Sequence, residues 1–390
     1  MVQKKKITLA LPNRIDASNA DKVSQELNDA ITAAGGDVSI TLDAGKLDYI
    51  SSAGLRVLLS LKKRYGDVSV TEVSRDVFEI FETTGFDQIL SVKKRRRVVS
   101  VEGCEAIGKG CCGTVYRLDP ETIIKVYHDA TEETLEEIEN EKRMAQLALV
   151  GGIPTAISYD VVKVGDSYGS VFELLNAETF NDMVIKNPEN LDAIMRQYVD
   201  FIKLVNATEI DDPMLPSSKN KFYGYLEVLR ETLGETLYAK LKGLIDGIKD
   251  SRHVVHGDAQ MKNIMLVNGD PMLIDMDTLS AGAPIFDLQA IYVTYIAYAE
   301  DEPENPMSFL GISYEMARQI WDKVIELYFE EGYPGGKEAV VQKILVLAYT
   351  RFLHQVVTSS SADSPLGKLR VKHSLEKLTE LTKIVDDLNF

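Results

Sequence analysis

A short segment of the chain, residues 255–279, gathers polar side chains that could carry out chemistry. These side chains are, in order, His256, Asp258, Asn263, Asp275 and Asp277. A carboxylate such as that of Asp258 can accept a hydrogen bond from a hydroxyl group and orient it for attack. Amide and carboxylate oxygens, such as those of Asn263 and Asp275, are hard ligands that suit Mg²⁺. The segment could therefore hold an attacking hydroxyl beside a metal-bound phosphate.

The spacing within this segment predicts how its polar residues meet. Two short apolar runs flank Asn268-Gly269-Asp270, which is a typical tight turn between antiparallel strands. The hairpin would place Asp258 and Asn263 near the start of one arm and Asp275 at the end of the other. An Asp, then an Asn, then an Asp after a hairpin is the pattern of a kinase catalytic loop with its metal-binding aspartate. The pattern predicts phosphoryl transfer from ATP, with Mg²⁺ held against the triphosphate.

A glycine-rich motif upstream predicts the part of the site that binds phosphates. Gly108, Gly110 and Gly113 form the sequence GxGxxG, which alone could be a dinucleotide-binding turn. The residues that follow indicate two strands of a hairpin, 114–118 and 123–126, and no helix. In this context the glycines are expected to let the backbone approach nucleotide phosphates closely.

Lys125 lies within the second of these strands, in a β-branched apolar run. After a glycine-rich hairpin it is the expected phosphate-binding lysine, and it needs an acidic partner on the next helix, predicted over residues 132–149. Glu141 shares a helical face with the apolar residues of that helix. It is therefore the first candidate for the partner of Lys125, and Glu137 is the second.

The rest of the chain predicts a hinge followed by a helical lobe. Glu173 and Leu174 end a predicted hairpin at the place where a hinge between two lobes would lie, so their backbone groups are expected to meet adenine. Beyond residue 179, apolar residues recur mostly at helical spacing. The predicted helical stretches are 194–204, 223–248, 288–298, 320–328 and 340–357.

Residues 101–390 resemble the aminoglycoside phosphotransferase and choline kinase-like family, a branch of the protein-kinase-like fold. The motifs that match in order are Gly108, Gly110, Gly113, Lys125, Glu141, His256-Gly257-Asp258, Asn263 and Asp275. The resemblance implies a β-rich N-lobe over 101–175, a helical C-lobe over 176–390, and ATP and Mg²⁺ as cofactors. It implies that Asp258 orients the hydroxyl of a small-molecule acceptor. It also implies that Asn263 and Asp275 hold Mg²⁺ and that Lys125 holds the nucleotide phosphates.

Three further residues are expected to support this machinery. His256 is interpreted as a structural brace of the loop and not as a base. Asp277 stands where the family usually has a Gly after the metal aspartate, and it could support the metal ligands from behind. Asp287 is expected to brace the catalytic loop through hydrogen bonds, although an ordinary helix cap would also explain it. Gln260 stands at a position where protein kinases carry a lysine, and in this respect the sequence resembles choline kinases.

The first hundred residues show a separate pattern of alternating strands and helices, which predicts a small α/β domain. Strands are expected over 7–11, 38–42 and 68–70. Ser18 is expected to cap the first helix, and a last helix over 75–84 is expected to end at Gly85.

The stretch LDYISSAGLRVLL within this domain resembles the STAS domain, the fold of bacterial anti-sigma factor antagonists. The resemblance supports a STAS domain over residues 1–92 and implies an anti-sigma-type partner protein. In that family a serine at this helix N-terminus is phosphorylated by a partner kinase, and a helix N-terminus receives phosphate well. Ser52 is the better candidate and Ser51 the second, although an N-cap role alone would also explain either residue.

Composition adds limits on domains, partners and compartment. The length of 390 residues predicts two or three domains, and the net charge of −17 argues against a nucleic-acid partner while suiting a cationic substrate. Cys104, Cys111 and Cys112 form no paired framework, which favours a reducing cytosol. The sequence predicts no signal peptide and no membrane-spanning helix, because its apolar runs are too short. The basic run 93–97 predicts an exposed linker over 93–100, with an electrostatic docking strip as the alternative.

Three functions fit these observations. The first is a small-molecule kinase, an ATP:alcohol phosphotransferase, with a regulatory STAS domain; the short path from Asp275 to Asp287 and the lack of an Ala-Pro-Glu motif favour it. The second is a protein kinase that phosphorylates STAS serines, including Ser52 of its own chain. The third is a nucleotide-sensing scaffold without catalysis, which the intact motifs disfavour.

An aromatic cage for an alkylammonium acceptor could come from Tyr223, Tyr225, Trp321 and Tyr328, although aromatic residues at this spacing more often belong to a core.

Overall fold

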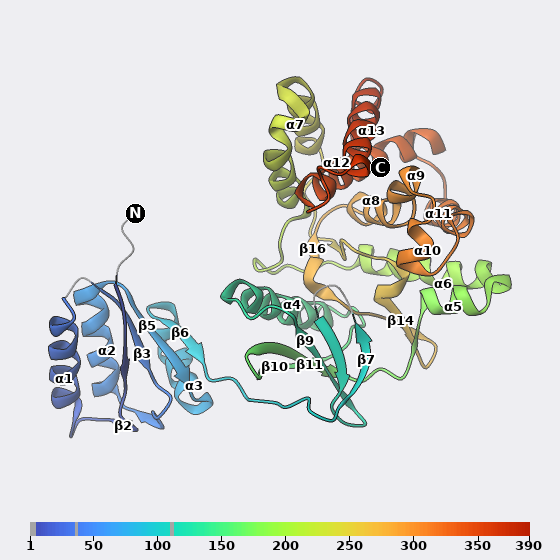
Figure 1. Ribbon diagram of the computed structural model, residues 1–390. Helices are drawn as coiled ribbons and strands as arrows, with labels where there is room; N and C mark the ends of the chain where they lie inside the picture. Colours follow the sequence, from blue (N-terminus) through green and yellow to red (C-terminus); the bar gives the residue numbers. More distant parts are fainter. Residues whose placement is uncertain (1–4, 36–37, 110–112) are drawn as a thin grey trace. The chain divides into compact units, whose positions relative to one another are not determined.

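The computed structural model describes residues 5–35, 38–109 and 113–390 (Figure 1). The chain folds as two compact units, Met1–Ser100 and Val101–Phe390. Each unit has its own large hydrophobic core. Within the described residues, no helix combines the length and the apolar character that crossing a membrane requires.

The first unit is a four-stranded parallel sheet with three helices, as the alternating pattern predicts. The strands are β1 (Lys5–Ala10), β3 (Val38–Asp43), β5 (Val68–Val73) and β6 (Ser91–Lys94), in the order β1-β3-β5-β6. A short parallel pair joins β2 (Arg14–Ile15) to β4 (Tyr49–Ile50). The helices are α1 (Ala20–Ala33), α2 (Ser52–Tyr65) and α3 (Arg75–Thr84). In β3 the alternate residues Val38, Ile40 and Leu42 are buried, which fixes the face of the strand that meets the helices.

Two local features of this unit bear on the sequence predictions. The helix α3 ends at Gly85 as predicted, because Gly85 adopts the left-handed φ of 71° that a glycine accepts without steric cost. The prediction that Ser18 caps α1 is wrong. The N-cap is Asn19, and the Ser18 hydroxyl instead donates to Asp16 Oδ1 at 2.6 Å within the preceding turn.

The basic run begins inside the sheet of the first unit. Lys93 and Lys94 belong to β6, which pairs with β5, and the N–H of Arg95 donates to the carbonyl of Val73 at 2.7 Å. The backbone is therefore engaged in strand pairing at the start of the segment that the charge pattern predicts to be a linker. Exposed lysines at the edge of a sheet also discourage pairing with another chain.

The second unit begins with a five-stranded antiparallel sheet, the N-lobe, in the order β10-β11-β9-β8-β7. The strands are β7 (Glu105–Lys109), β8 (Gly113–Arg117), β9 (Thr122–Tyr127), β10 (Ser158–Val164) and β11 (Ser167–Glu173), and the helix α4 (Glu132–Val150) lies between β9 and β10 in the chain. Tyr127, Ile138 and Val161 form a small apolar cluster between this helix and the sheet. The cluster holds α4 against the strand that carries Lys125.

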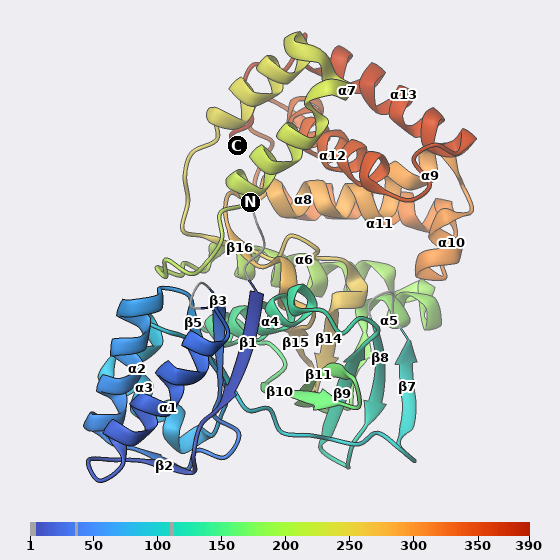
Figure 2. The same ribbon diagram turned by 60° about the vertical axis from the view of Figure 1, so that its left-hand side comes forward.

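The remainder of this unit is the largely helical C-lobe. Its helices are α5 (Phe180–Lys186), α6 (Leu191–Ala207), α7 (Ser218–Asp246), α8 (Ile285–Tyr292), α9 (Tyr298–Asp301), α10 (Asn305–Leu310), α11 (Tyr314–Tyr328), α12 (Lys337–Thr358) and α13 (Pro365–Leu381). Its short strands are β12 (Glu178–Thr179), β13 (Val254–Val255), β14 (Ile264–Val267), β15 (Asp270–Leu273) and β16 (Ser280–Ala281). The N-lobe sheet and the group α7, α12 and α13 lie at opposite ends of the unit, with β14 and β16 between them (Figures 1 and 2). The predicted fold class, an α/β domain followed by a two-lobed kinase-like domain, is confirmed.

The hairpin predicted after Asp258 is present. Strands β14 and β15 pair in antiparallel register, and Asn268 and Gly269 turn between them with φ values of 53° and 94°. Two consecutive positive φ angles define the turn that an Asn-Gly sequence favours. The hairpin thus brings the segment before β14 to the same end as the segment after β15.

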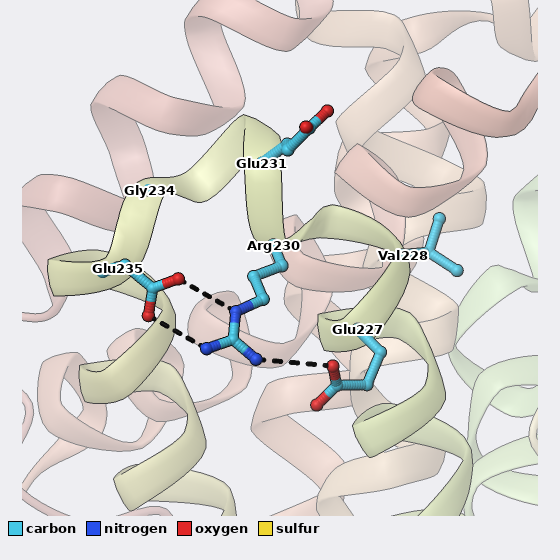
Figure 3. Close-up of a pocket in the computed structure, with 6 residues that line it drawn as sticks. All are labelled: Glu227, Val228, Arg230, Glu231, Gly234 and Glu235. Carbon is cyan, nitrogen blue, oxygen red and sulfur yellow. Dashed lines mark hydrogen bonds and ion pairs between the residues drawn. The ribbon is translucent and has the colours of Figure 1, made fainter.

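Helix α7 bends at Gly234, whose φ of 68° and ψ of 157° interrupt the helical backbone. Figure 3 shows Arg230 reaching across this bend to Glu235, with hydrogen bonds of 2.9 and 3.1 Å, and towards Glu227 at 3.8 Å. A pocket of about 470 Å³ lies at the bend, and among its charged lining residues Arg230 pairs with Glu227 and Glu235. None of its lining residues belongs to the motifs that predict chemistry.

Candidate active site

The catalytic loop, defined here as residues 256–263, connects β13 to β14 and carries Asp258. The side-chain amide of Asn263 donates two hydrogen bonds to Asp258. Asn263 Nδ2 lies 2.9 Å from the backbone carbonyl oxygen of Asp258 and 3.0 Å from Asp258 Oδ2. Gln260 Nε2 also donates to Asp258 Oδ2 at 2.9 Å. The carboxylate of Asp258 is therefore held in one orientation, and the atom of Asn263 left for a ligand is its amide oxygen.

Asp287 supports the catalytic loop from beneath. Its side chain is completely buried at the start of α8, and its Oδ1 accepts from the N–H of Gly257 at 2.7 Å. Its Oδ2 accepts from the N–H of His256 at 3.2 Å and from Asn206 Nδ2 at 2.7 Å. Burial raises the pKa of Asp287, while these donors act in the opposite direction. The geometry is that of a brace, and the side chain does not cap the helix on which it lies.

His256 is also fully buried and also has a bracing geometry. Its Nδ1 accepts from the N–H of Asp258 at 3.3 Å, so the proton of a neutral ring lies on Nε2 and is donated to the carbonyl of Ile274 at 3.2 Å. The carbonyl of His256 accepts from Thr278 Oγ1 at 2.7 Å. These bonds tie the catalytic loop to the segment that follows β15.

Asn206 joins this network although its sequence context did not single it out. It lies on α6 and is 4% exposed; its Nδ2 donates to Asp287 and to the carbonyl of Val254, and its Oδ1 accepts from Tyr328 at 3.0 Å. The signal that could have found it is a polar residue on the apolar face of a predicted helix. Such a residue must be hydrogen-bonded to a distant element if it is buried.

Asp275 follows β15 with a φ of 63° and a ψ of 70°, a left-handed conformation that Asp tolerates better than most side chains. Its Oδ1 accepts from Lys125 Nζ at 3.1 Å. The same ammonium lies 3.6 Å from Glu141 Oε2, and Tyr127 donates to that oxygen at 2.7 Å. The structure thus places Glu141, which is 5% exposed, beside Lys125, whereas Glu137 is exposed.

The charges around Lys125 are balanced within the protein. Burial alone would lower the pKa of Lys125, but the carboxylates of Glu141 and Asp275 raise it above its ordinary value. Burial raises the pKa of Glu141, and Lys125 opposes this shift. The ammonium group of Lys125 thus lies between two carboxylates, at the boundary between the lobes.

Asp277 lies two residues beyond Asp275, with its side chain accessible to solvent. The surrounding protein, followed by the negative charge of Asp275, raises the pKa of Asp277. Asp277 forms part of the wall of a second pocket, beside Thr278 and Lys221. It is therefore close to Asp275, the predicted metal ligand, but faces a different cavity.

A pocket of about 330 Å³ lies between the lobes. Its walls are mainly apolar and combine strands of the N-lobe, the segment 172–175 and the hairpin of the C-lobe. The polar residues that line it include Lys125, Glu141, Asn263 and Asp275. Four side chains that lie far apart in the sequence thus converge on one cavity, which has the mainly apolar lining and few polar groups typical of a small-molecule site.

Glu173 and Leu174 line this pocket, but their backbone N–H groups are already engaged. The N–H of Leu174 donates to the carbonyl of Glu121 at 2.7 Å, and that of Glu173 donates to the carbonyl of Ile157 at 3.0 Å. The carboxylate of Glu173 also accepts from the N–H of Ile157 at 2.7 Å. Backbone carbonyls, and not these N–H groups, are what the two residues can offer a purine.

The glycine-rich motif is described in part. Gly108 lies in β7, with its Cα paired across to Val115, and Gly113 begins β8. A Cβ at Gly113 would lie 2.5 Å from the carbonyl oxygen of Val126, so only glycine fits there without a shift of backbone. Gly110, together with Cys111 and Cys112, lies outside the described residues.

In the first unit, Ser51 and Ser52 begin α2 and have different roles. Ser51 is the N-cap, and its Oγ accepts from the N–H of Ala53 at 3.2 Å. Ser52 is the first residue of the helix, and its side chain is exposed. Ser52 is thus the more accessible hydroxyl at this helix N-terminus.

The four aromatic residues considered for an alkylammonium cage have separate partners. Tyr223 donates to Asp246 at 2.7 Å, Tyr328 donates to Asn206, and buried Trp321 packs edge-on against Tyr292. Tyr225 stacks on His354, with ring centroids 4.2 Å apart. Core packing, and not a shared cage, accounts for these aromatic side chains.

Comparisons with known proteins agree with this description. Residues 2–92 match the model of the Mlab, STAS domain family, and residues 103–327 match that of the phosphotransferase enzyme family. The putative anti-sigma factor antagonist BtrV of Bordetella bronchiseptica is 37% identical over 90 residues, which cover 22% of this chain and 76% of that protein.

A solved structure, a complex of APH(2")-IIa, shows the fold of the second unit. The ternary complex of APH(2")-IIa with streptomycin and ATP is 16% identical and has a TM-score of 0.50, covering 72% of this chain and 93% of that one. A choline/ethanolamine kinase family protein from Mesorhizobium loti is 12% identical with a TM-score of 0.48, covering 72% of this chain and 88% of that one. The first unit is a STAS domain, and, because the second family model spans more than half of the residues, the chain belongs to the phosphotransferase enzyme family.

Proposed function

We propose that the second unit transfers the γ-phosphoryl group of ATP, in the presence of Mg²⁺, to a hydroxyl group of a small molecule. The observation that carries this proposal is the convergence of Lys125, Asn263 and Asp275 on the cavity between the lobes. Asp258 is hydrogen-bonded directly to one of them, Asn263, at 3.0 Å. Phosphoryl transfer depends mainly on positioning and on neutralising charge, and this set of residues can do both.

The proposed role of Asp258 follows from its hydrogen bonds. Its Oδ2 is occupied by the amide groups of Gln260 and Asn263, which leaves Oδ1 for the hydroxyl of the acceptor. The acceptor oxygen forms a bond to the γ-phosphorus as the bond from that phosphorus to the bridging oxygen of ADP breaks, and the hydroxyl proton passes to Asp258. Orientation of the hydroxyl group before attack is the main contribution expected of such a residue.

The donor atoms near Lys125 fit a magnesium ion. The Asn263 amide oxygen and the second carboxylate oxygen of Asp275 are hard ligands that line the same cavity. When bound, Mg²⁺ neutralises negative charge on the phosphates as it develops. Lys125 contributes a fixed positive charge for the phosphates, and Glu141 holds that lysine in place. The carbonyls of Glu173 and Leu174 are proposed to face the adenine.

The STAS domain is proposed to regulate this activity through a partner of the anti-sigma type. Ser52 is the proposed modification site, because its side chain is exposed at the start of α2 while Ser51 is engaged as the N-cap. We expect the protein to act in the cytosol, where ATP is available.

The accessibility of Ser52 also supports a second candidate function, in which the second unit phosphorylates STAS serines. Intact mass after incubation with ATP and Mg²⁺ tests it. A gain of one phosphate that is lost in Ser52→Ala would support this function, and an unmodified mass in the wild type would remove it.

Nucleotide binding tests the proposed function most simply. Isothermal titration of ATP into the full chain, with and without Mg²⁺, is expected to show binding that Mg²⁺ strengthens. Asp275→Asn should weaken Mg²⁺-dependent binding by about tenfold or more, equivalent to about 1.4 kcal/mol. Asp270→Asn makes the same chemical change in the exposed hairpin turn and should bind like the wild type. Absence of ATP binding, or binding in Asp275→Asn that responds fully to Mg²⁺, would contradict the proposal.

A further inference from the structure

A pocket of about 400 Å³ lies next to the catalytic loop and shares no lining residue with the nucleotide cavity. One wall comes from Asn220 and Lys221 on the first turn of α7 and the other from Asp277 and Thr278. Because Thr278 Oγ1 donates to the carbonyl of His256 at 2.7 Å, this second wall is attached directly to the catalytic loop. The pocket is therefore adjacent to the loop that carries Asp258.

The start of α7 is anchored at this pocket. The N–H of Ala281 donates to the carbonyl of Pro216 at 2.7 Å, and the hydroxyls of Ser218 and Ser280 lie 2.7 Å apart in a buried hydrogen bond. Lys221 follows within the first helical turn. Its place in the wall is thus set by contacts of the backbone on both sides of the pocket.

A second cation reaches the catalytic loop from α12. Arg351 Nη1 donates to the carbonyl of Gly257 at 2.5 Å. Its Nε is buried and has no hydrogen-bond partner among residues 5–35, 38–109 and 113–390. One turn later on α12, His354 stacks on Tyr225 of α7, with an interplanar angle of 30°. The helices α7 and α12 therefore bring three basic side chains to one side of the catalytic loop.

The electrostatics show that these basic groups act on one another. Removal of water by the surrounding protein, followed by the charge of Arg351, lowers the pKa of Lys221; Asp277 and Asp258 oppose this shift. Burial, followed by Arg351 and then Lys221, lowers the pKa of His354. The cations Lys221 and Arg351 thus lie on this side of the catalytic loop together with the carboxylates of Asp277 and Asp258.

Lys221 differs from Lys219 and Lys242 of the same helix, whose ammonium groups are paired with carboxylates. Lys219 lies 3.3 Å from Asp250, and Lys242 lies 2.9 Å from Asp246. Within the part of the chain that the structure describes, the ammonium group of Lys221 has no hydrogen bond or ion pair of this kind. A cation at the wall of a pocket without a paired anion is a feature that a ligand can complete.

We propose that this pocket receives the acceptor and that the acceptor is an alcohol carrying an anionic group, a carboxylate or a phosphate ester. The inference rests on the proposed function: the hydroxyl lies at Asp258 and the anionic group at Lys221 and Arg351. Arg351 and His354 lie beyond residues 103–327, the segment that the phosphotransferase family model matches. Lys221 lies inside that segment, so the charge selection is attributed only in part to residues that the family match does not include.

Matched alcohols test this inference with the full chain. The probes are glycerol, D-glycerate and glycerol 3-phosphate, then ribose and ribose 5-phosphate, with choline as the cationic alcohol. ADP formation in the presence of Mg²⁺ gives kcat/KM for each. We expect the anionic member of a set to exceed its neutral relative by about tenfold or more, and Lys221→Glu to remove that preference. Lys240→Glu, the same change at an exposed lysine beyond the Gly234 bend, should preserve it.

A spectroscopic measurement completes the test. Sulfate titration monitored by NMR of the histidine side chains should raise the pKa of His354 in the wild type and leave it unchanged in Lys221→Glu. Turnover of neutral or cationic alcohols in preference to anionic ones would overturn the inference. A preference for anionic alcohols that survives Lys221→Glu would also overturn it. If no probe is phosphorylated, a His354 pKa that does not respond to sulfate would overturn it as well. Absence of ATP binding would instead refute the proposed function, because Lys221→Glu is expected to bind ATP like the wild type.

Discussion

The substitution Asp287→Asn tests how the catalytic loop is held. The buried carboxylate accepts from three donors, the N–H groups of His256 and Gly257 and the side-chain amide of Asn206. Asparagine has the same shape but only one acceptor oxygen. Whichever way its amide is turned, at least one of these buried donors then faces an NH₂ group.

The expected magnitude follows from this count of donors. A buried donor left without a partner costs about 1–3 kcal/mol, and the remaining bonds lose the benefit of a charged acceptor. Because burial raises the pKa of Asp287, removing its charge offsets part of the loss. We expect the free energy of unfolding to fall by about 3 kcal/mol, equivalent to about 5 °C in the melting temperature of a unit of this size. We also expect slower turnover, because the loop that positions Asp258 is no longer fixed.

The assay is urea unfolding followed by the fluorescence of Trp321, the single tryptophan of the chain. Trp321 is buried in the C-lobe against Tyr292, so its signal reports on this lobe. Asp386→Asn makes the same change at an exposed position and serves as the control. An Asp287→Asn protein that is as stable and as active as the wild type would refute the bracing role.

Two further substitutions test the N-lobe, each with a matched control. Glu141→Gln removes the buried anion 3.6 Å from Lys125 and should weaken ATP binding by about tenfold in calorimetry, whereas exposed Glu137→Gln should not. Equal affinities of the two variants would contradict the assignment of the partner. Gly113→Ala places a Cβ 2.5 Å from a backbone carbonyl and should lower the free energy of unfolding by about 1–3 kcal/mol. Gly108→Ala meets nothing closer than 3.8 Å, so a Gly113→Ala protein as stable as Gly108→Ala would contradict the close approach of these strands.

The parts of the site that could be predicted are those set by local pattern. The turn at Asn268 and Gly269 is encoded by its own residues, so the hairpin of β14 and β15 was predictable. The position of Glu141 beside Lys125 follows from helical periodicity, because only one face of α4 can meet the sheet. The other candidate site residues were predicted from the order of the kinase motifs along the chain.

The contacts that could not be predicted join elements far apart in the sequence. Asn206 and Arg351 reach the catalytic loop from α6 and α12. The place of Asn206 on an apolar helical face could mark it as buried, but no local pattern shows that its partner belongs to this loop. Ser18 failed as a cap because the helix begins one residue later, with Asn19 as its N-cap, while the Ser18 hydroxyl donates to Asp16 within the preceding turn. The backbone N–H groups of Glu173 and Leu174 donate to the carbonyls of Ile157 and Glu121, which lie at other places in the sequence.

The central claim is that Asp258 orients an acceptor hydroxyl at a nucleotide held by the other residues of the cleft. The most direct measurement compares ATP affinity and ADP formation, with pooled alcohols as acceptors, in the wild type and in Asp258→Asn. The account predicts unchanged ATP affinity in the variant and a rate lower by about a hundredfold or more. A variant that forms ADP at the rate of the wild type, or a wild type that binds ATP but forms no phosphorylated alcohol from the pool, would contradict it.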